Sequence, residues 1–481
     1  PWNNPDEPAH FNYIAHIVEH REFPELTTGD WDAALLDQAI PERFHPRFEV
    51  SSIRYEAHQP PLYYLLGAPV YAATAQVSLR ARVFAVRGIS IALGLLLGCA
   101  VFALAREVLP DRPFSAPLAA GIALLIPMST AMAASINNDM LAMALSTLAL
   151  LMTLRFLRWW SKDRLMKHDG PSGSMLFQAR GAPANLMALS LGVMIGLLLL
   201  TKLTVYVIVL LMLGSLVAIA RQALALGTFD KYGRFVLLVG LSAMIVSGWW
   251  FIRSGVVYGW GDLLAQRRHE VVVIGQAQYE HFGVENWRYL VTTVFHSLFA
   301  QFGWMTIVVD DLTYALYGVF VLLGVCGLVM AGSAALTPPM RVLSVAMLLV
   351  AGQLLYYNAS FIQAQGRYLF PAIGPLAVML ALGWSRLGES RVGCRDVPLI
   401  LWSSLALTTG IAGIADWEVG IGSATLFALC LVFLGAGYHW ARRPASGHAQ
   451  TGAGHTVLIL SSFGLLNLMC LLRYVIPYYR G

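Results

Sequence analysis

Charged residues are scarce in this sequence: Asp, Glu, Lys and Arg together make up 12% of its 481 residues. A soluble globular domain carries about 25%, so most of this chain cannot be the surface of a water-soluble protein. Apolar residues make up 57%, which is typical of a polytopic membrane protein. The formal net charge of +5 does not indicate nucleic-acid binding, because the basic residues lie in short loops between apolar runs.

Cysteine is also rare, with five residues in the whole chain. Cys394 lies in a basic loop, and the other four lie in apolar stretches. No spacing among them resembles a zinc or thiol-redox motif. We therefore expect the cysteines to be unpaired.

Long apolar runs dominate the chain after residue 83. Twelve segments each approach the ~20 apolar residues needed to cross a bilayer. They lie at 88–106, 114–135, 140–157, 185–201, 204–220, 235–253, 312–331, 341–358, 368–385, 397–414, 421–440 and 456–475. The sequence therefore predicts an all-α polytopic membrane protein with about twelve visible transmembrane helices.

Basic residues gather on one side when these helices are counted by alternation. The loop at 155–180 is rich in Lys and Arg, and the other strongly basic loops fall on the same side. Cytoplasmic loops carry such an excess. The opposite, periplasmic side of a bacterial inner membrane then receives residues 1–83, the long loop at 254–311 and several short turns.

Three regions follow from this division. Residues 1–83 are expected to form a first outer loop with amphipathic helices, too short and broken for a large core of their own. Residues 84–386 would be the transmembrane core, and 387–481 the C-terminal transmembrane helices. The apolar stretch from Pro60 to about Ala75 is too short to span and is expected to be interfacial or re-entrant.

Two adjacent carboxylates, Asp6 and Glu7, precede a predicted amphipathic helix. Pro8 suits a first helical position, so Glu7 would cap the helix and Asp6 would lie just outside it. The helix would end before Pro24. It is predicted from apolar residues at helical spacing, namely Phe11, Ile14, Ala15 and Val18. Alone, Asp6 would be interpreted as a solvated loop acid.

Further charges stand at helix ends on the same outer face. Lys202, Arg253 and Arg367 each follow or interrupt apolar residues, and Asp139 begins a helix. Each one alone is typical of an interfacial anchor or a helix cap. Charges at bilayer depth are costly unless they meet a counter-ion, and a lipid phosphate is the anion at that level. The set predicts a lipid-linked phosphate held by the three cations, with Asp6 facing the group it carries.

Seven short motifs resemble, in the right order, those of bacterial polyprenyl-phosphate-sugar-dependent glycosyltransferases. They are Pro5–Phe11, His58–Tyr64, Ile136–Asp139, Leu200–Thr204, Trp249–Arg253, Gln301–Met305 and Gln365–Pro371. This is the glycosyltransferase C (GT-C) superfamily, near the protein O-mannosyltransferases and the aminoarabinose transferases of lipid A. The resemblance reaches about residue 386 and implies a GT-C-like helix bundle. Because the family has a helix just before the Asp-Glu motif, it also implies a preceding helix and about thirteen in total.

The resemblance implies that Asp6 is the catalytic acidic residue of the first outer loop, with the role of a base. Asp6 would take a proton from the acceptor hydroxyl as that hydroxyl attacks the anomeric carbon, and one displacement would invert that centre. The cations would stabilise the charge gained by the departing phosphate. Glu7 is predicted to share the catalytic role. Residues expected to orient the substrate or a cation are Asp139, His58, His10 and Tyr63.

A bound divalent metal is left open by the sequence. If one is present, the most suitable ligands are Asp6, Glu7 and His58. The expected partners are a polyprenyl-phosphate lipid donor, the membrane, and a glycan, lipid or protein acceptor, without nucleic acid. The charged run at 267–270 is expected to be a solvated face, with contact to the acceptor or a headgroup as the alternative.

Two other classes compete with a glycosyltransferase. A transporter or flippase of a lipid-linked sugar would explain the helices equally well. However, transporters usually show internal repeats and polar interruptions near the bilayer midplane, whereas the charges here lie at one interface. A purely structural membrane protein would leave the acidic pair and the cations without a shared purpose. We therefore favour an inverting glycosyltransferase.

Overall fold

The computed structural model describes residues 1–167, 181–225, 229–275, 283–359, 361–389 and 448–480. The described part is mainly helical, as the sequence predicts. Its one sheet consists of two short strands, β1 (Gln301–Phe302) and β2 (Ile307–Val308), paired antiparallel. Two predicted spans, 397–414 and 421–440, lie outside the described residues.

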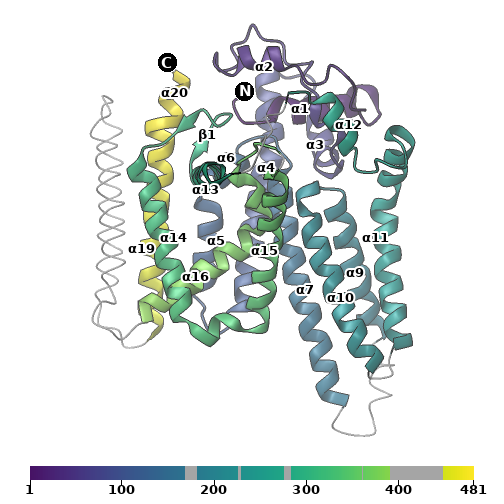
Figure 1. The fold of residues 1–481 in the computed structure, drawn as a ribbon, viewed down its shortest axis with the longest axis vertical. Coiled ribbons are helices and arrows are strands. Elements are labelled where there is room, and N and C mark those ends of the chain that lie inside the picture. Colours follow the sequence, from purple (N-terminus) through teal and green to yellow (C-terminus); the bar gives the residue numbers. More distant parts are fainter. Residues whose placement is uncertain (168–180, 226–228, 276–282, 360, 390–447, 481) are drawn as a thin grey trace.

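Eight helices in the described ranges are long and apolar enough to cross a membrane, or nine if one bent pair counts as a single span. Most of them run along the long axis of the molecule (Figure 1). They are α4 (Leu79–Val108), α7 (Asp139–Lys167), α10 (Tyr206–Ala225), α11 (Phe229–Tyr258), α14 (Asp311–Met330), α15 (Pro338–Asn358), α16 (Ile373–Glu389) and α19 (His448–Met469). The predicted transmembrane bundle is therefore confirmed for this part of the chain.

Three predicted spans differ in detail. Helix α4 begins at Leu79 rather than at residue 88, because the Ser78 hydroxyl caps it and its basic first turns extend beyond the apolar run. The span expected at 114–135 is broken into α5 (Ser115–Leu125) and α6 (Pro127–Ala133), bent by 68°. Pro127 causes the break, because the residue before a proline favours extended backbone. Helix α9 (Gly181–Leu199) has a shorter apolar stretch than the eight spans.

An outer layer covers one end of the bundle. It contains α1 (Glu7–His20), α2 (Ala33–Ala39), the 3₁₀ turn η1 (Tyr55–His58), α3 (Leu62–Ala73) and α12 (Gln266–Val272). The β1–β2 hairpin and α13 (Val284–Phe299) lie at the same end (Figure 1). As predicted, the stretch after Pro60 is too short to span: α3 has 12 residues.

Helix α1 begins one residue earlier than predicted. Glu7 is its first residue and Asp6 is the N-cap, with φ at 65° in the left-handed region. This conformation is uncommon for a non-glycine residue. The Asp6 side chain does not cap the helix, so its carboxylate is available for other partners. The apolar face is as predicted, with Phe11 and Ile14 fully buried.

The Glu7 carboxylate is completely buried and accepts four hydrogen bonds. The Arg87 guanidinium donates two of them, at 2.8 and 2.7 Å. The backbone N–H groups of Trp2 and Ile136 donate the others, each at 3.0 Å. Glu7 thereby joins the N-terminal segment and α1 to α4 and to the segment that precedes α7.

Helices α14 and α16 cross in backbone contact. A Cβ placed on Gly383 would lie 1.8 Å from the backbone oxygen of Gly324, and one on Gly327 would lie 2.0 Å from the backbone oxygen of Gly383. Only glycine permits this approach, since backbone atoms cannot move aside as a flexible side chain can.

We expect Gly383→Ala to lower the free energy of unfolding by at least about 1–3 kcal/mol, because the new methyl group overlaps the facing backbone. The matched control is Gly352→Ala in α15, where nothing lies within 4 Å of the new Cβ. The control should be neutral or gain up to about 1 kcal/mol of helix propensity. Thermal unfolding in detergent measures both, and equal stability of the two variants would contradict the close crossing.

Glu7→Gln is expected to destabilise the protein by about 3 kcal/mol, because it leaves a partly buried guanidinium without its counter-charge. Glu42→Gln is the control, since its ion pair with Arg47 is exposed and should contribute less than about 1 kcal/mol. Denaturation in detergent compares the two. A Glu7→Gln protein as stable as the control would show that the four-bond cluster does not hold the outer layer in place.

Candidate functional site

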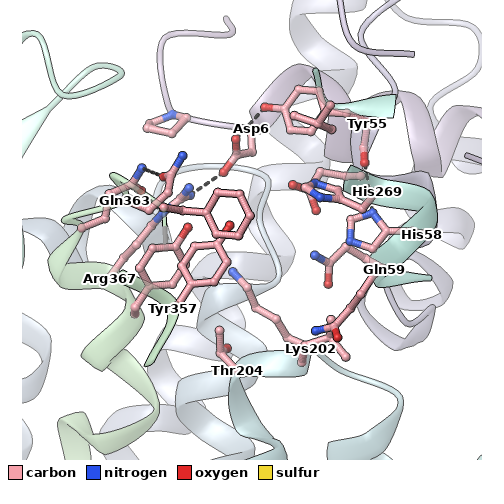
Figure 2. Close-up of a pocket in the computed structure, with 18 of the residues that line it drawn as sticks. Asp6, Tyr55, His58, Gln59, Lys202, Thr204, His269, Tyr357, Gln363 and Arg367 are labelled. Carbon is pink, nitrogen blue, oxygen red and sulfur yellow. Dashed lines mark hydrogen bonds and ion pairs between the residues drawn. The ribbon is translucent and has the colours of Figure 1, made fainter. Parts of the chain in front are cut away.

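A cavity of about 740 Å³ lies beneath the outer layer, at the end of the transmembrane bundle. Its walls come from segments far apart in the sequence: the start of α1, η1, α12, the turn between β1 and β2, and α15. The 3₁₀ turns η2 (Leu203–Val205) and η4 (Gly366–Ala372) complete it. Figure 2 shows Arg367 and Tyr357 on one side, His58 and His269 on the other, and Lys202 extending into the space between them.

Asp6 is held by two donors on the cavity wall. Its carboxylate forms an ion pair with Arg367 at 2.5 Å and accepts a hydrogen bond from the Tyr55 hydroxyl at 2.5 Å. Gln365 in turn accepts a hydrogen bond from the Arg367 Nε at 2.6 Å. Burial alone would raise the pKa of Asp6, but the Arg367 guanidinium and the Tyr55 hydroxyl lower that pKa to about 2. Asp6 is therefore ionised at neutral pH.

Lys202 forms a second ion pair at the same cavity. Its Nζ lies 2.5 Å from Oδ1 of Asp139, and both side chains are almost fully buried. Asp139 starts α7, and the side chain of Asn137 accepts a hydrogen bond from its N–H. Lys202 has extended backbone between α9 and η2, which places its side chain at the end of the bundle. The second oxygen of Asp139 has no hydrogen-bond partner among the residues described.

Arg253, the third predicted phosphate-binding cation, lies elsewhere. Its guanidinium donates to the carbonyl oxygens of Phe23 and Pro24, each at 2.9 Å, and rests over the Trp250 ring. It is not among the residues that line the cavity. Arg253 thus attaches the segment after α1 to α11. Apolar neighbours alone could not distinguish this role from phosphate binding.

Three histidines line the cavity. His10 is on α1, where its Nδ1 lies 2.9 Å from the Tyr64 hydroxyl. The rings of His58 and His269 lie 4.7 Å apart between centroids. Burial lowers the pKa of His58 to about 4, and burial together with the neighbouring His58 lowers the pKa of His269 to about 3. The facing pair is therefore neutral at pH 7.

Two other predicted site residues do not face the cavity. Tyr63 is fully buried, and its hydroxyl lies 2.9 Å from the Ser90 hydroxyl and accepts a bond from the Asn137 N–H. Glu7 is saturated by the hydrogen bonds described above. Both side chains are therefore buried away from the cavity, and their predicted roles in the reaction stay predictions.

The predicted metal ligands do not converge. Within the described ranges, no three His, Cys, Asp or Glu side chains form a group that could hold a metal ion. Both oxygens of Glu7 are bound by Arg87 and two backbone N–H groups, so Glu7 is not available as a ligand. The predicted set of Asp6, Glu7 and His58 is therefore not assembled as one ligand group in the part of the chain that the structure describes.

Several cavity residues carry no recognisable sequence signal. Tyr55 and Glu56 precede the motif that begins at His58, in a segment without helical or strand periodicity. His269 and Glu270 also line the cavity, although their charged run was expected to be a solvated face. Only the contact between α12 and η1 brings these groups to the site.

Comparison with known proteins shows what this geometry resembles. Neither a protein-family model nor a curated protein matches the sequence. Among solved structures, ArnT from Cupriavidus metallidurans bound to undecaprenyl phosphate matches with a TM-score of 0.54 and 15% identity, over 97% of this chain and 73% of that one. Its apo form matches with a TM-score of 0.50 and 13% identity, over 97% and 72%.

The Archaeoglobus fulgidus oligosaccharyltransferase in its apo form has a TM-score of 0.45 and 15% identity, over 96% of this chain and 52% of that chain. The two ArnT structures span almost the whole chain, including the outer layer. The chain therefore has the fold of ArnT, a membrane-embedded helix bundle of the kind that the sequence resemblance implies.

Proposed function

We propose that this protein transfers a sugar from a polyprenyl-phosphate carrier to an acceptor hydroxyl, with inversion at the anomeric carbon. One observation carries the proposal: Lys202 and Arg367, from distant segments, reach one cavity at the end of a membrane bundle. Each is paired with a carboxylate of the protein. Such an arrangement suits a ligand that brings its own negative charge to the membrane surface.

A lipid-linked phosphate meets these requirements. The bond from the anomeric carbon to the phosphate breaks during transfer, so the phosphodiester becomes a monoester and gains negative charge. Preorganised cations at that position lower the barrier because their attraction grows as the charge develops. Lys202 and Arg367 would bind the phosphate, with Asp139 and Asp6 as their counter-ions before the donor arrives.

The surroundings of the cavity favour a lipid-borne donor. Leu354, Tyr356 and Phe361 contribute apolar and aromatic surface to its wall, and Tyr356 is 83% exposed. The matching ArnT structure was solved with undecaprenyl phosphate bound. We infer that the isoprenoid tail of the donor enters from the bilayer along this wall, while its headgroup occupies the polar interior.

The orientation of the bundle supports an outward-facing site. Helix α7 starts at Asp139 beside the cavity and ends at Lys167, where the most basic loop of the sequence begins. Because such loops are cytoplasmic, the cavity lies at the opposite end, on the periplasmic face of a bacterial inner membrane. Acceptors exposed on that face are glycans, lipids and proteins.

Asp6 belongs to the proposed catalytic machinery through its contact with Arg367. As N-cap of α1 it holds the guanidinium at the cavity wall, and its charge decides how strongly Arg367 attracts the donor phosphate. Whether Asp6 also takes the acceptor proton stays a prediction from the sequence motif. Two ligands already occupy its oxygens, so the base role would require release from Arg367.

Lys202→Gln and Arg367→Gln should each weaken the binding of undecaprenyl phosphate by about 10- to 100-fold, because each removes a charge-assisted contact. Arg253→Gln should leave that affinity unchanged, although it removes the same type of charge. Titration calorimetry in detergent measures all three. An equal loss of affinity in Arg253→Gln would place the phosphate outside the described cavity.

Asp6→Asn should lower the turnover of an undecaprenyl-phosphate sugar by about 100-fold or more, because it removes an ionised group from the reacting site. Asp37→Asn in α2 is the control, an exposed carboxylate of the same outer layer. Release of undecaprenyl phosphate, followed by mass spectrometry in proteoliposomes, reports turnover. Full activity of Asp6→Asn would exclude a catalytic role, and transport of the intact donor without transfer would favour a transporter.

A further inference from the structure

Glu56 lines the cavity, as Asp6 and Glu270 do, and its surroundings differ from those of Asp6 and Asp139. It lies in η1, directly after Tyr55, and lines the cavity. Its side chain accepts no hydrogen bond and forms no ion pair with any residue that the structure describes. Asp6 and Asp139, in contrast, are each bound by a cation. Glu56 is thus a carboxylate that faces the ligand space without a partner.

Glu56 has a defined electrostatic environment. Burial, and then the negative charge of Asp6, raise the pKa of its carboxyl, while nearby positive charge acts in the opposite direction. The groups that act on it from the neighbouring elements are Asp6 and His10 of α1, Lys202 before η2, and Arg367 of η4. The pKa of His10 is itself lowered by burial, so the imidazole is a weak source of positive charge. The net effect on the Glu56 carboxyl is a higher affinity for protons.

The pKa of Asp6 is lowered and that of the neighbouring Glu56 is raised, which suggests that the two carboxyl groups have different roles. A general base works best when its pKa is close to the working pH. Two carboxyl groups whose environments shift their pKa values apart often have different acid–base roles. Asp6 has the environment of a permanent counter-ion, because Arg367 and Tyr55 occupy its oxygens. Glu56 has the environment of a carboxyl group that can take up and release a proton.

We propose that Glu56 accepts the proton of the acceptor hydroxyl, while Asp6 remains ionised as the partner of Arg367. This assignment rests on the proposed glycosyl transfer and refines its mechanism. It follows from the free carboxylate of Glu56 at the cavity and from the occupied oxygens of Asp6. It assigns the acceptor to the part of the cavity walled by η1 and α12.

The step balances without another reactant. The acceptor oxygen forms a bond to the anomeric carbon as its O–H bond breaks, and the proton passes to the Glu56 carboxylate. The bond between the anomeric carbon and the phosphate oxygen breaks at the same time. Its electron pair leaves with the polyprenyl phosphate, which Lys202 and Arg367 stabilise. Glu56 then returns its proton to water when the products leave.

Glu56→Gln is the main test, since it keeps the size of the side chain and removes its basicity. We expect kcat to fall by about 100-fold, whereas the affinity for undecaprenyl phosphate should stay unchanged because both cations remain. Glu49→Gln, an exposed carboxylate of the outer layer, should retain full turnover. The donor is whichever member of a panel of undecaprenyl-phosphate hexoses, pentoses and aminopentoses the wild-type protein turns over fastest.

The pH profile separates the two carboxylates. The basic form must be the carboxylate, so kcat/KM should fall as the pH drops through the pKa of the base in the free enzyme. With Glu56 as base, this fall should lie above pH 4.5, the ordinary value for Glu. With Asp6 as base, it should lie near pH 2. Glu56→Asp should keep an acid limb at a shifted midpoint, and Glu56→Gln should lose it.

Chemical labelling gives a readout that needs no donor. Dicyclohexylcarbodiimide modifies protonated carboxyl groups in apolar surroundings, and peptide mass spectrometry locates the product. We expect labelling of Glu56 that increases as the pH is lowered, with Asp6 unmodified. Labelling of Asp6 in preference to Glu56, or full turnover by Glu56→Gln, would overturn the assignment. If the wild-type protein instead fails to bind undecaprenyl phosphate, the proposed function itself is wrong.

Discussion

The ion pair between Asp6 and Arg367 is the interaction around which the site is arranged. It joins the start of the outer layer to η4, the 3₁₀ turn before α16, which lies more than 300 residues later in the sequence. Burying either charge alone would cost several kcal/mol, whereas the pair can remain in a poorly hydrated cavity. The same reasoning applies to Lys202 and Asp139. Two buried pairs thus allow an apolar bundle to keep cations at a ligand site.

Adjacent acids in the N-terminal motif have opposite environments because of the backbone between them. Glu7 is the first residue of α1 and points into the protein, where Arg87 and two N–H groups surround it. Asp6 has a left-handed conformation just before the helix and turns its carboxylate to the cavity. A rigidly held Glu7 therefore supports the position of Asp6. The two carboxylates therefore have different surroundings, although they are neighbours in sequence.

The carboxylates Asp6, Asp139 and Glu56 differ in what they already bind. Asp6 and Asp139 neutralise the cations that would receive a phosphate, and Glu56 is left without a partner. In the proposed mechanism, a donor phosphate replaces Asp139 and Asp6 as the partner of Lys202 and Arg367. The two cations are then paired with an anion both before and after binding. Such an exchange also makes the site sensitive to the number of charges the ligand carries. In the proposed mechanism, the free carboxylate of Glu56 remains available for the acceptor.

The sequence by itself determined the membrane class, most helix positions and the apolar face of α1, because these depend on local composition and periodicity. It also identified Asp6, Lys202 and Arg367 as cavity residues through motifs at helix ends. It could not decide that Glu7 is saturated inside the protein, that Arg253 binds backbone carbonyls, or that Glu56 faces the ligand space. A sequence shows which charges a chain carries, but the partner of each charge is set by the packing of segments hundreds of residues apart. Only the tertiary structure decides which charges remain available to a ligand.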